Sequence, residues 1–167
     1  MADMLLFLDT EFTDYIDIDL ISIGLVSEDG RATFYAERND YRREATSDFV
    51  RDAVLPHLGQ QPENACSREE LTRRLYDWLQ GFSGTVQIAC DSTHDRDLLW
   101  DALEDGLPTN LEPTVLKLAW QSEDRIFQEA LCKYHEQPGR PRHHALHDAQ
   151  ALRHGWLALN ASETRGS

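Results

Sequence analysis

The stretch MLLFLDTEF, residues 4–12, sets much of what we expect of the fold and of the chemistry. Its first five residues are apolar, which is typical of a buried strand. Asp9 and Glu11 come directly after this apolar run. Because alternate residues of a strand point to the same face, the two carboxylates lie on one side with about 6–7 Å between their backbones. A divalent cation would relieve their repulsion, whereas acids at an exposed strand end would simply be solvated.

Four further strands and five helices are predicted from the apolar patterns. Residues 20–26 and 31–37 are strand-like and flank Asp29-Gly30, which is typical of a β-hairpin. The other predicted strands are 85–90 and 114–119, and the predicted helices are 48–55, 67–80, 95–104, 123–135 and 143–159. A meander followed by alternating strands and helices predicts an α/β fold in which helices flank a mixed five-stranded sheet. We expect a single domain over residues 1–159 and a frayed tail over 160–167.

The charge of the chain is strongly acidic and unevenly spread. With 16 basic and 30 acidic residues, the 167-residue chain has a net charge of −14, which argues against binding duplex DNA through a broad cationic face. Residues 133–154 are the exception, with four basic residues, Arg140 and Arg142 among them, and two acidic ones. Three scattered cysteines, the lack of a signal peptide and the lack of a long apolar run predict a cytoplasmic protein with no membrane partner.

Two further places in the sequence hold acids next to predicted strand or helix ends. Asp91 and Asp95 follow the strand 85–90, and the carboxyl ends of such strands are where sites form. An aspartate at a helix start also serves as a helix cap, so this pair has a purely structural alternative. Asp148 lies beside the apolar stripe of the last helix, where a carboxylate needs a partner or a metal.

Histidines cluster at the start of that last helix. His143 is placed at the helix entrance, where a neutral imidazole is a proton acceptor near pH 7. The alternatives are a solvated helix start, or a zinc site made by His143, His144 and His147, which lacks a spaced fourth ligand. Phe12, next to the first acid pair, has two interpretations as well: it stacks on a nucleobase, or it is a core residue.

The joint pattern is more specific than its parts. Asp9-x-Glu11, then Asp95, then His143 and Asp148 separated by four residues, resemble the DEDD family of 3′→5′ exonucleases in its His-bearing DEDDh branch. Stretches 9–12, 20–26, 28–31 and 143–149 are similar to the RNase AS group, and more distantly to oligoribonuclease and RNase T. The second family motif usually reads Asn-x-x-Phe-Asp. Here Asp91 and His94 replace its Asn and Phe, so Asp91 is an alternative ligand to Asp95.

The resemblance implies an RNase H-like fold and a metal-dependent 3′→5′ exoribonuclease. It implies that single-stranded RNA, including adenylate-rich 3′ ends, is hydrolysed to nucleoside 5′-monophosphates by a homodimer. Two Mg²⁺ or Mn²⁺ ions would be held by Asp9, Glu11, Asp95 and Asp148. His143 would be the general base, and Glu11 would also accept a hydrogen bond from the terminal 3′-hydroxyl.

Substrate contacts and rival functions complete the expectations. Phe12 would pack on the terminal base, and Arg140 and Arg142 would meet the phosphate backbone. A DNA-directed exonuclease of the same branch is the rival enzyme, because nothing in the residues reads the 2′-hydroxyl. An acidic binding module that mimics nucleic acid is the rival from another class, although it does not need an imidazole and a carboxylate to converge.

Overall fold

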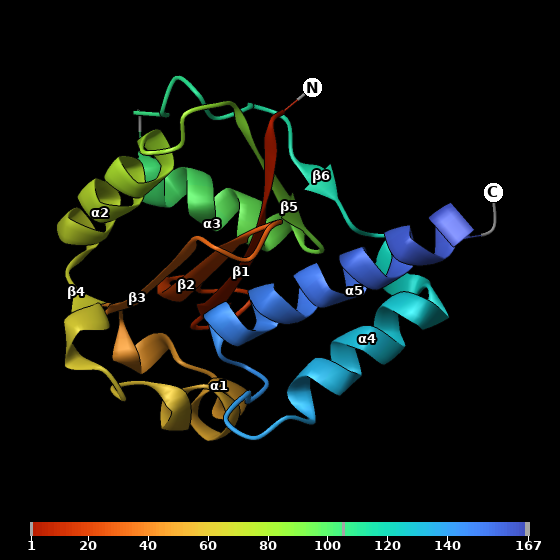
Figure 1. The fold of residues 1–167 in the computed structure, drawn as a ribbon. Helices are drawn as coiled ribbons and strands as arrows, with labels where there is room; N and C mark the ends of the chain where they lie inside the picture. The colour runs from red at the N-terminus through yellow and green to blue at the C-terminus, as the bar shows by residue number, and fades with distance from the viewer. Residues whose placement is uncertain (1, 105, 166–167) are drawn as a thin grey trace.

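A single mixed sheet with helices on both faces forms the centre of the molecule (Figure 1). The computed structural model describes residues 2–104 and 106–165. The strands are β1 (Met4–Phe12), β2 (Leu20–Ser27), β3 (Thr33–Arg38), β4 (Ala65–Cys66), β5 (Val86–Cys90) and β6 (Leu116–Lys117). Their order across the sheet is β4-β3-β2-β1-β5-β6. Strands β1, β2 and β3 form an antiparallel meander, whereas β5 runs parallel to β1, β6 to β5 and β4 to β3.

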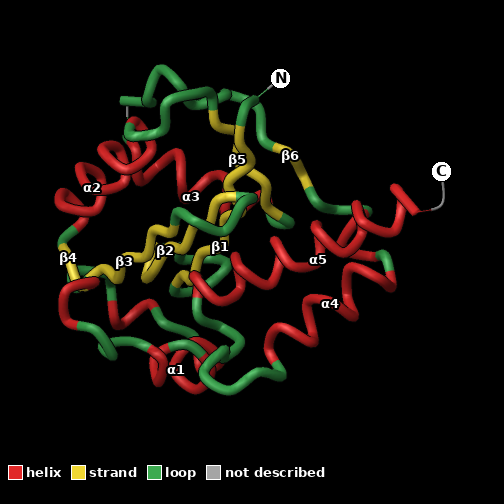
Figure 2. The backbone as a smooth tube through the Cα atoms, viewed as in Figure 1, coloured by secondary structure: helices red, strands yellow, loops and turns green. Residues whose placement is uncertain are grey.

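In the part of the chain that the structure describes, five α-helices lie around this sheet (Figure 2). They are α1 (Asp48–Ala53), α2 (Arg68–Gln80), α3 (Thr93–Leu103), α4 (Arg125–His135) and α5 (Ala145–Arg165). Helices α2 and α3 cover one face of the sheet, α5 crosses β1 and β2 on the other face, and α4 packs against α5. Within the described residues, no helix combines the length and the apolar character that a membrane crossing requires.

Strand β1 is buried on both sides, as its apolar run predicts. Leu6 and Leu8 belong to the core under α2 and α3, whereas Phe7 belongs to the core under α5. All three side chains are fully buried. The α/β fold with a mixed sheet and flanking helices is therefore confirmed. Ser67 and Glu70 form a capping box at the start of α2.

The structure corrects three predicted details. The sheet has six strands rather than five, because β4 lies in a segment predicted as a loop and is too short to produce an alternating pattern. Strand β6 covers only Leu116–Lys117 of the predicted 114–119. Helix α5 continues to Arg165, so residues 160–165 are not the frayed tail we expected. No glycine or proline occurs between Trp156 and Arg165, and the hydroxyls of Ser162 and Thr164 bond to carbonyls one turn back.

The close approach of α5 to β2 depends on Gly24. This residue pairs with Asp9 of β1 and faces the first turn of α5. A Cβ atom at position 24 would lie 2.3 Å from the backbone nitrogen of Leu146 and 2.4 Å from its Cα, which is far inside van der Waals contact. Only a residue without a side chain lets the helix backbone lie this close to the strand. This contact fixes the start of α5 beside the end of β1.

The substitution Gly24→Ala should therefore displace the start of α5. We expect it to lower the free energy of unfolding by about 2–4 kcal/mol, because the clash is with rigid backbone. Gly106→Ala is the matched control, since the nearest atom to its added Cβ is 4.0 Å away. Chemical denaturation of both variants measures the difference. Equal stabilities would show that α5 does not depend on this contact.

Candidate active site

Four carboxylates from three separate elements meet in one pocket of about 520 Å³. Asp9 and Glu11 come from β1, Asp95 from the first turn of α3 and Asp148 from the first turn of α5. His143 also lines this pocket, at the entrance of α5. The structure thus brings together all five residues that the sequence singled out for metal binding and proton transfer.

The potential ligand atoms fall into two neighbouring groups. The carboxylates of Asp9, Asp91 and Asp95 offer oxygens within 4.8 Å of one another, and Glu11, His143 and Asp148 form a second such group. Carboxylate oxygens are the ligands that Mg²⁺ and Mn²⁺ prefer, so the chemistry of this donor set fits those ions. Asp9 lies close enough to Asp91, Asp95, Glu11 and Asp148 for each to raise its pKa, which places it at the centre of the site.

Asp95 and Asp91 differ in how firmly the structure holds them. Asp95 is 3% exposed, and its Oδ1 accepts hydrogen bonds from the backbone nitrogen of Thr10 at 3.1 Å and from Thr10 Oγ1 at 2.5 Å. These bonds tie α3 to β1 and aim the carboxylate at the pocket. Asp91 is exposed in the loop before α3 and lines the same pocket. The role of Thr10 could not be deduced from the sequence, because its partner is 85 residues away.

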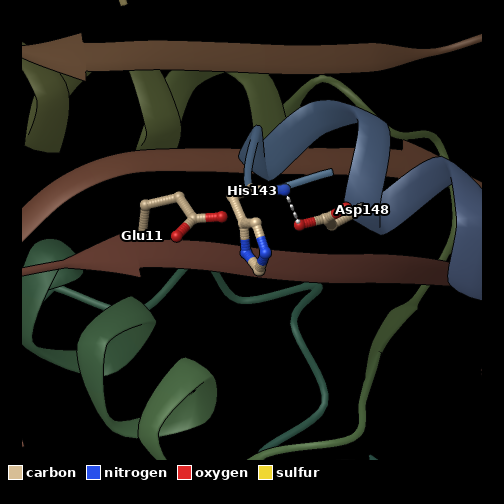
Figure 3. Close-up of side chains that lie close together, drawn as sticks. All are labelled: Glu11, His143 and Asp148. Atoms are coloured by element: carbon tan, nitrogen blue, oxygen red, sulfur yellow. Dashed lines mark hydrogen bonds between the residues drawn. The ribbon is translucent and has the colours of Figure 1, made fainter. Parts of the chain in front are cut away.

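Asp148 is held from two directions. Its Oδ2 accepts the backbone N–H of His143 at 2.9 Å (Figure 3), and its Oδ1 lies 3.2 Å from Nε2 of His135. His143 has a φ of 60°, so the chain turns sharply here before the helix begins. Nδ1 of His135 lies 3.0 Å from the carbonyl oxygen of Arg140, which can only accept, so Nδ1 carries a proton. Nε2 of His135 therefore holds Asp148 from α4 when a proton lies between the two groups, carried either by the imidazole or by the carboxyl, and no motif in the sequence indicates His135.

Burial and mutual repulsion raise the pKa of Asp9, Glu11, Asp95 and Asp148. Burial, followed by Asp148 and Asp95, raises the pKa of Glu11 to about 8. Burial is also the main cause that raises the pKa values of Asp95 and Asp148 to about 7, and it raises that of Asp9 well above its usual range. Such a cluster is costly without a cation, because like charges in a partly buried site oppose ionisation.

The pKa of His143 is shifted in the opposite direction, to a lower value. Partial burial, then the nearby His57 and Arg142, lower its pKa. The imidazole is therefore neutral at pH 7 and has a free electron pair for a proton. The ring of Phe49 meets it edge-on at 5.0 Å, with 59% of Phe49 exposed to solvent.

Aromatic rings line the mouth of the pocket. Phe12 stacks on His94 with 5.7 Å between ring centroids, and Tyr15 meets both rings edge-on at 5.3 Å. Tyr15 is 72% exposed. The sequence pointed to Phe12 alone. The exposure of Tyr15 and Phe49 beside the pocket could not be anticipated, since a lone aromatic in a loop gives no periodic signal.

The two predicted backbone-binding arginines lie apart. Arg142 lines a small pocket of about 180 Å³ together with Asp9, His143 and Asp148. The guanidinium of Arg140 instead lies 4.5 Å above the ring of Tyr134, and this residue lines neither the main nor the small pocket.

The histidines of the zinc alternative do not converge on one point: the rings of His144 and His147 lie 4.7 Å apart, whereas His143 lines the carboxylate pocket. His144 stacks on Tyr35 at 4.4 Å, and His147 bonds to the hydroxyl of Tyr134 at 2.8 Å. Both line another cavity of about 830 Å³, away from the carboxylates. Among residues 2–104 and 106–165, neither belongs to a cluster of three potential ligands. The geometry does not support a zinc site of His143, His144 and His147.

The sequence is similar to proteins named exoribonucleases. Two 3′-5′ exoribonucleases of Mycobacterium tuberculosis, from strains CDC 1551 and H37Rv, are each 34% identical to this chain, over 96% of the chain and 95% of the relative. The chain belongs to this exoribonuclease family. No family model matches the sequence.

The fold has a solved counterpart. S. pombe Pop2p in its Mg²⁺- and Mn²⁺-bound form superposes with a TM-score of 0.65, over 98% of this chain and 85% of that chain, at 16% identity. The RNase H-like class predicted from the sequence is confirmed by this likeness, with the corrected number of strands.

The raised carboxylate pKa values predict how stability depends on pH without metal. A carboxyl whose pKa is higher in the folded than in the unfolded protein stabilises the fold while it is protonated, and this stabilisation is lost as pH rises through the folded pKa. Glu11, Asp95 and Asp148 therefore lower the free energy of unfolding of the metal-free protein as pH rises from 7 to 9. The histidines with lowered pKa values change protonation only below about pH 6.5, so they do not change the free energy of unfolding between pH 7 and 9. We expect the free energy of unfolding in EDTA to fall by about 2 kcal/mol from pH 7 to 9.

Denaturation at pH 7, 8 and 9 measures this change. Millimolar Mn²⁺ should remove the part of the fall that comes from the carboxylates, because metal binding favours their ionised form. Burial raises the pKa of the Cys66 and Cys90 thiols, which leaves a smaller fall near pH 9. Asp148→Asn should reduce the fall in EDTA, whereas Glu69→Gln, at an exposed position of α2, should leave it unchanged. A stability in EDTA that stays level or rises over this range would contradict the electrostatic description of the site.

Proposed function

We propose that this protein is a metal-dependent 3′→5′ exoribonuclease that releases nucleoside 5′-monophosphates from single-stranded RNA. The observation that carries the proposal is the convergence of four carboxylates with raised pKa values and a neutral His143 in one open pocket. The family membership supports RNA as the substrate, because both relatives are named exoribonucleases.

In the proposed site, Asp9, Glu11, Asp95 and Asp148 hold two Mg²⁺ or Mn²⁺ ions. When bound, such ions supply positive charge that offsets the carboxylates and the scissile phosphate and that lowers the pKa of a bound water. The central position of Asp9 suits a ligand shared by both ions. Thr10 and His135 keep Asp95 and Asp148 in place, so that the carboxylates are oriented before substrate arrives.

His143 acts as the general base in this proposal. Its neutral imidazole lines the same pocket as the carboxylates and accepts the proton of the water that attacks the last phosphodiester. Glu11 also accepts a hydrogen bond from the terminal 3′-hydroxyl. Phe12 packs on the terminal base, and the exposed rings of Tyr15 and Phe49 extend the aromatic surface at the pocket mouth.

The charge distribution suggests which substrates suit the site. With a net charge of −14, the protein offers few cations to a long duplex, so we expect short single-stranded substrates and strong salt sensitivity. Arg142, at the edge of the site, is placed to meet a phosphate of the RNA backbone.

A preference for adenylate ends, a homodimer and a cytoplasmic location stay predictions. A DNA-directed exonuclease and an acidic binding module are the alternative functions that the first experiment separates from this one.

The decisive assay follows the length of a 5′-labelled RNA that ends in adenylates, beside its DNA twin. With Mn²⁺ we expect a ladder that shortens from the 3′ end, faster on RNA, and no cleavage in EDTA. Asp148→Asn should reduce the rate at least about a hundredfold, since it removes a charge from the centre of the site. Glu69→Gln, matched in chemistry, should leave the rate unchanged. Faster cleavage of DNA would favour the DNA-directed enzyme, and no cleavage under any divalent metal would favour the binding module.

A second pair of variants separates the two candidate ligands near the start of α3. Asp95→Asn should lose at least about ten times more activity than Asp91→Asn, because Asp95 is buried and is oriented by Thr10. Thermal melts with and without Mn²⁺ accompany the rates, so that loss of folding is distinguished from loss of metal binding. If Asp91→Asn is the more damaging change, Asp91 is the ligand and Asp95 is chiefly structural.

A further inference from the structure

A second polar hollow lies beside α5, apart from the catalytic pocket. Its volume is about 290 Å³, and it shares no lining residue with the pocket that holds the four carboxylates. Helix α5 contributes His147, Gln150, Arg153 and His154, which recur every three or four residues and so lie on one side of the helix. Arg140, from the loop before α5, closes the hollow.

Tyr134 of α4 organises these side chains. Its buried hydroxyl bonds to Nδ1 of His147 at 2.8 Å and also donates to Gln150. Its ring lies 4.9 Å from the ring of His154, and the guanidinium of Arg140 lies 4.5 Å above its face. The hollow is therefore a set of donors with fixed positions rather than a loose group of surface side chains.

Arg153 is fixed by a separate contact. Its Nε donates to the carbonyl oxygen of Glu28 at 2.7 Å, which leaves the two terminal nitrogens of its guanidinium free of that bond. Gly30 makes room for this arrangement: it has a φ of 76°, and a Cβ there would lie 2.8 Å from Nη2 of Arg153. A glycine at this turn thus satisfies the backbone conformation and the packing of the arginine together.

The hollow contains two permanent positive charges and no carboxylate among its lining residues. Within the part of the chain that the structure describes, neither Arg140 nor Arg153 has a carboxylate within 4.0 Å. The nearby acids hold other hydrogen bonds, although the charge of Arg153 also acts on Asp29: bonds from Ser27 and Arg31, and then the charges of Arg31 and Arg153, lower the pKa of Asp29. Glu28 Oε1 accepts from Trp156 Nε1, and Asp29 Oδ1 accepts from Ser27 Oγ and from the backbone of Arg31.

Such a grouping is unusual for a chain with almost twice as many acids as bases. Two guanidinium groups that face one hollow repel each other unless an anion lies between them. Burial, and then the charges of Arg153 and Arg140, lower the pKa of His154, so this imidazole lies close to both arginines. An oxyanion would accept hydrogen bonds from the arginines and remove the repulsion.

We propose that this hollow binds a phosphate group through Arg140 and Arg153, with His147, His154 and Gln150 as further polar contacts. The proposal rests on the proposed function for the source of the phosphate. Arginine binds the tetrahedral oxygens of a phosphodiester in an RNA backbone and of a free 5′-monophosphate by the same planar donors. If the phosphate belongs to the RNA backbone, the hollow binds nucleotides upstream of the 3′ end. If it belongs to a free 5′-monophosphate, the hollow binds the product.

The first experiment compares Arg140→Gln/Arg153→Gln with the control Arg73→Gln/Arg125→Gln, which removes the same charge from exposed positions on α2 and α4. Each protein is assayed on a dinucleotide and on a ten-nucleotide RNA. If the hollow holds RNA backbone, KM for the longer RNA rises about tenfold in the first variant only. The slope of log KM against log salt falls by about 0.7, because one phosphate contact is lost, and kcat on the dinucleotide stays within about twofold.

The second experiment titrates the wild-type protein in EDTA with inorganic phosphate and with AMP, and follows the arginine Nε–H signals in ¹⁵N–¹H spectra. If the hollow holds free phosphate, the Arg153 signal shifts at millimolar ligand while KM for the longer RNA stays unchanged in the double variant. If KM does not rise in the double variant and the Arg153 signal does not shift, the proposal is overturned. A wild-type protein that cleaves neither RNA would contradict the proposed function, and the titration would still test the hollow.

Two further variants guard against misfolding. Arg140→Lys/Arg153→Lys keeps both charges but loses the planar donors, so its KM for the longer RNA should lie between those of the wild type and of the glutamine pair. Arg140→Gln alone leaves the Arg153 bond to Glu28 intact and should raise KM for the longer RNA about threefold. If the lysine pair behaves like the glutamine pair in a protein that melts normally, the hollow contributes packing rather than charge, and the proposal fails.

Discussion

Repulsion among Asp9, Glu11, Asp95 and Asp148 is the constraint that the rest of this structure must accommodate. Each carboxylate is partly or fully buried, and burial together with the neighbouring acids raises its pKa. Folding thus brings together groups that would separate if they were free to move. The surrounding fold has to supply enough binding energy elsewhere to hold them, and a divalent cation is the partner that this arrangement favours.

The fold meets this constraint with contacts that reach across the sheet. The central strand β1 is anchored by apolar side chains on both faces, so that its end is rigid where Asp9 and Glu11 project. Thr10 ties α3 to this strand through Asp95. On the other face, Gly24 lets the backbone of α5 lie directly on β2, and His135 and the backbone of His143 fix Asp148. Three elements are therefore locked together near one point.

Helix α5 presents two different chemistries from two of its sides. One side carries Asp148 toward the acidic pocket, and another carries His147, Gln150, Arg153 and His154 toward the basic hollow. Tyr134 of α4 lies beneath the second side and bonds to two of its residues. An acidic site and a basic site on one rigid helix would hold a polyanionic substrate at two places, with cations serving one place and arginines the other. This arrangement reconciles a nucleic-acid substrate with a net charge of −14.

Local sequence determined the elements and the identity of the acidic residues. The apolar run before Asp9, the capping box at Ser67 and the stripe on the last helix each depend on neighbours within a few positions, and such patterns can be read directly. The contacts that complete the site could not be read, because they join residues far apart in the chain. Thr10 meets Asp95 across 85 positions, and His135 reaches Asp148 from a different helix. Arg140 and Arg142 are two residues apart in one loop, yet only the tertiary structure decided that one lies on Tyr134 and the other beside the carboxylates, since side-chain direction in a loop follows packing and not periodicity.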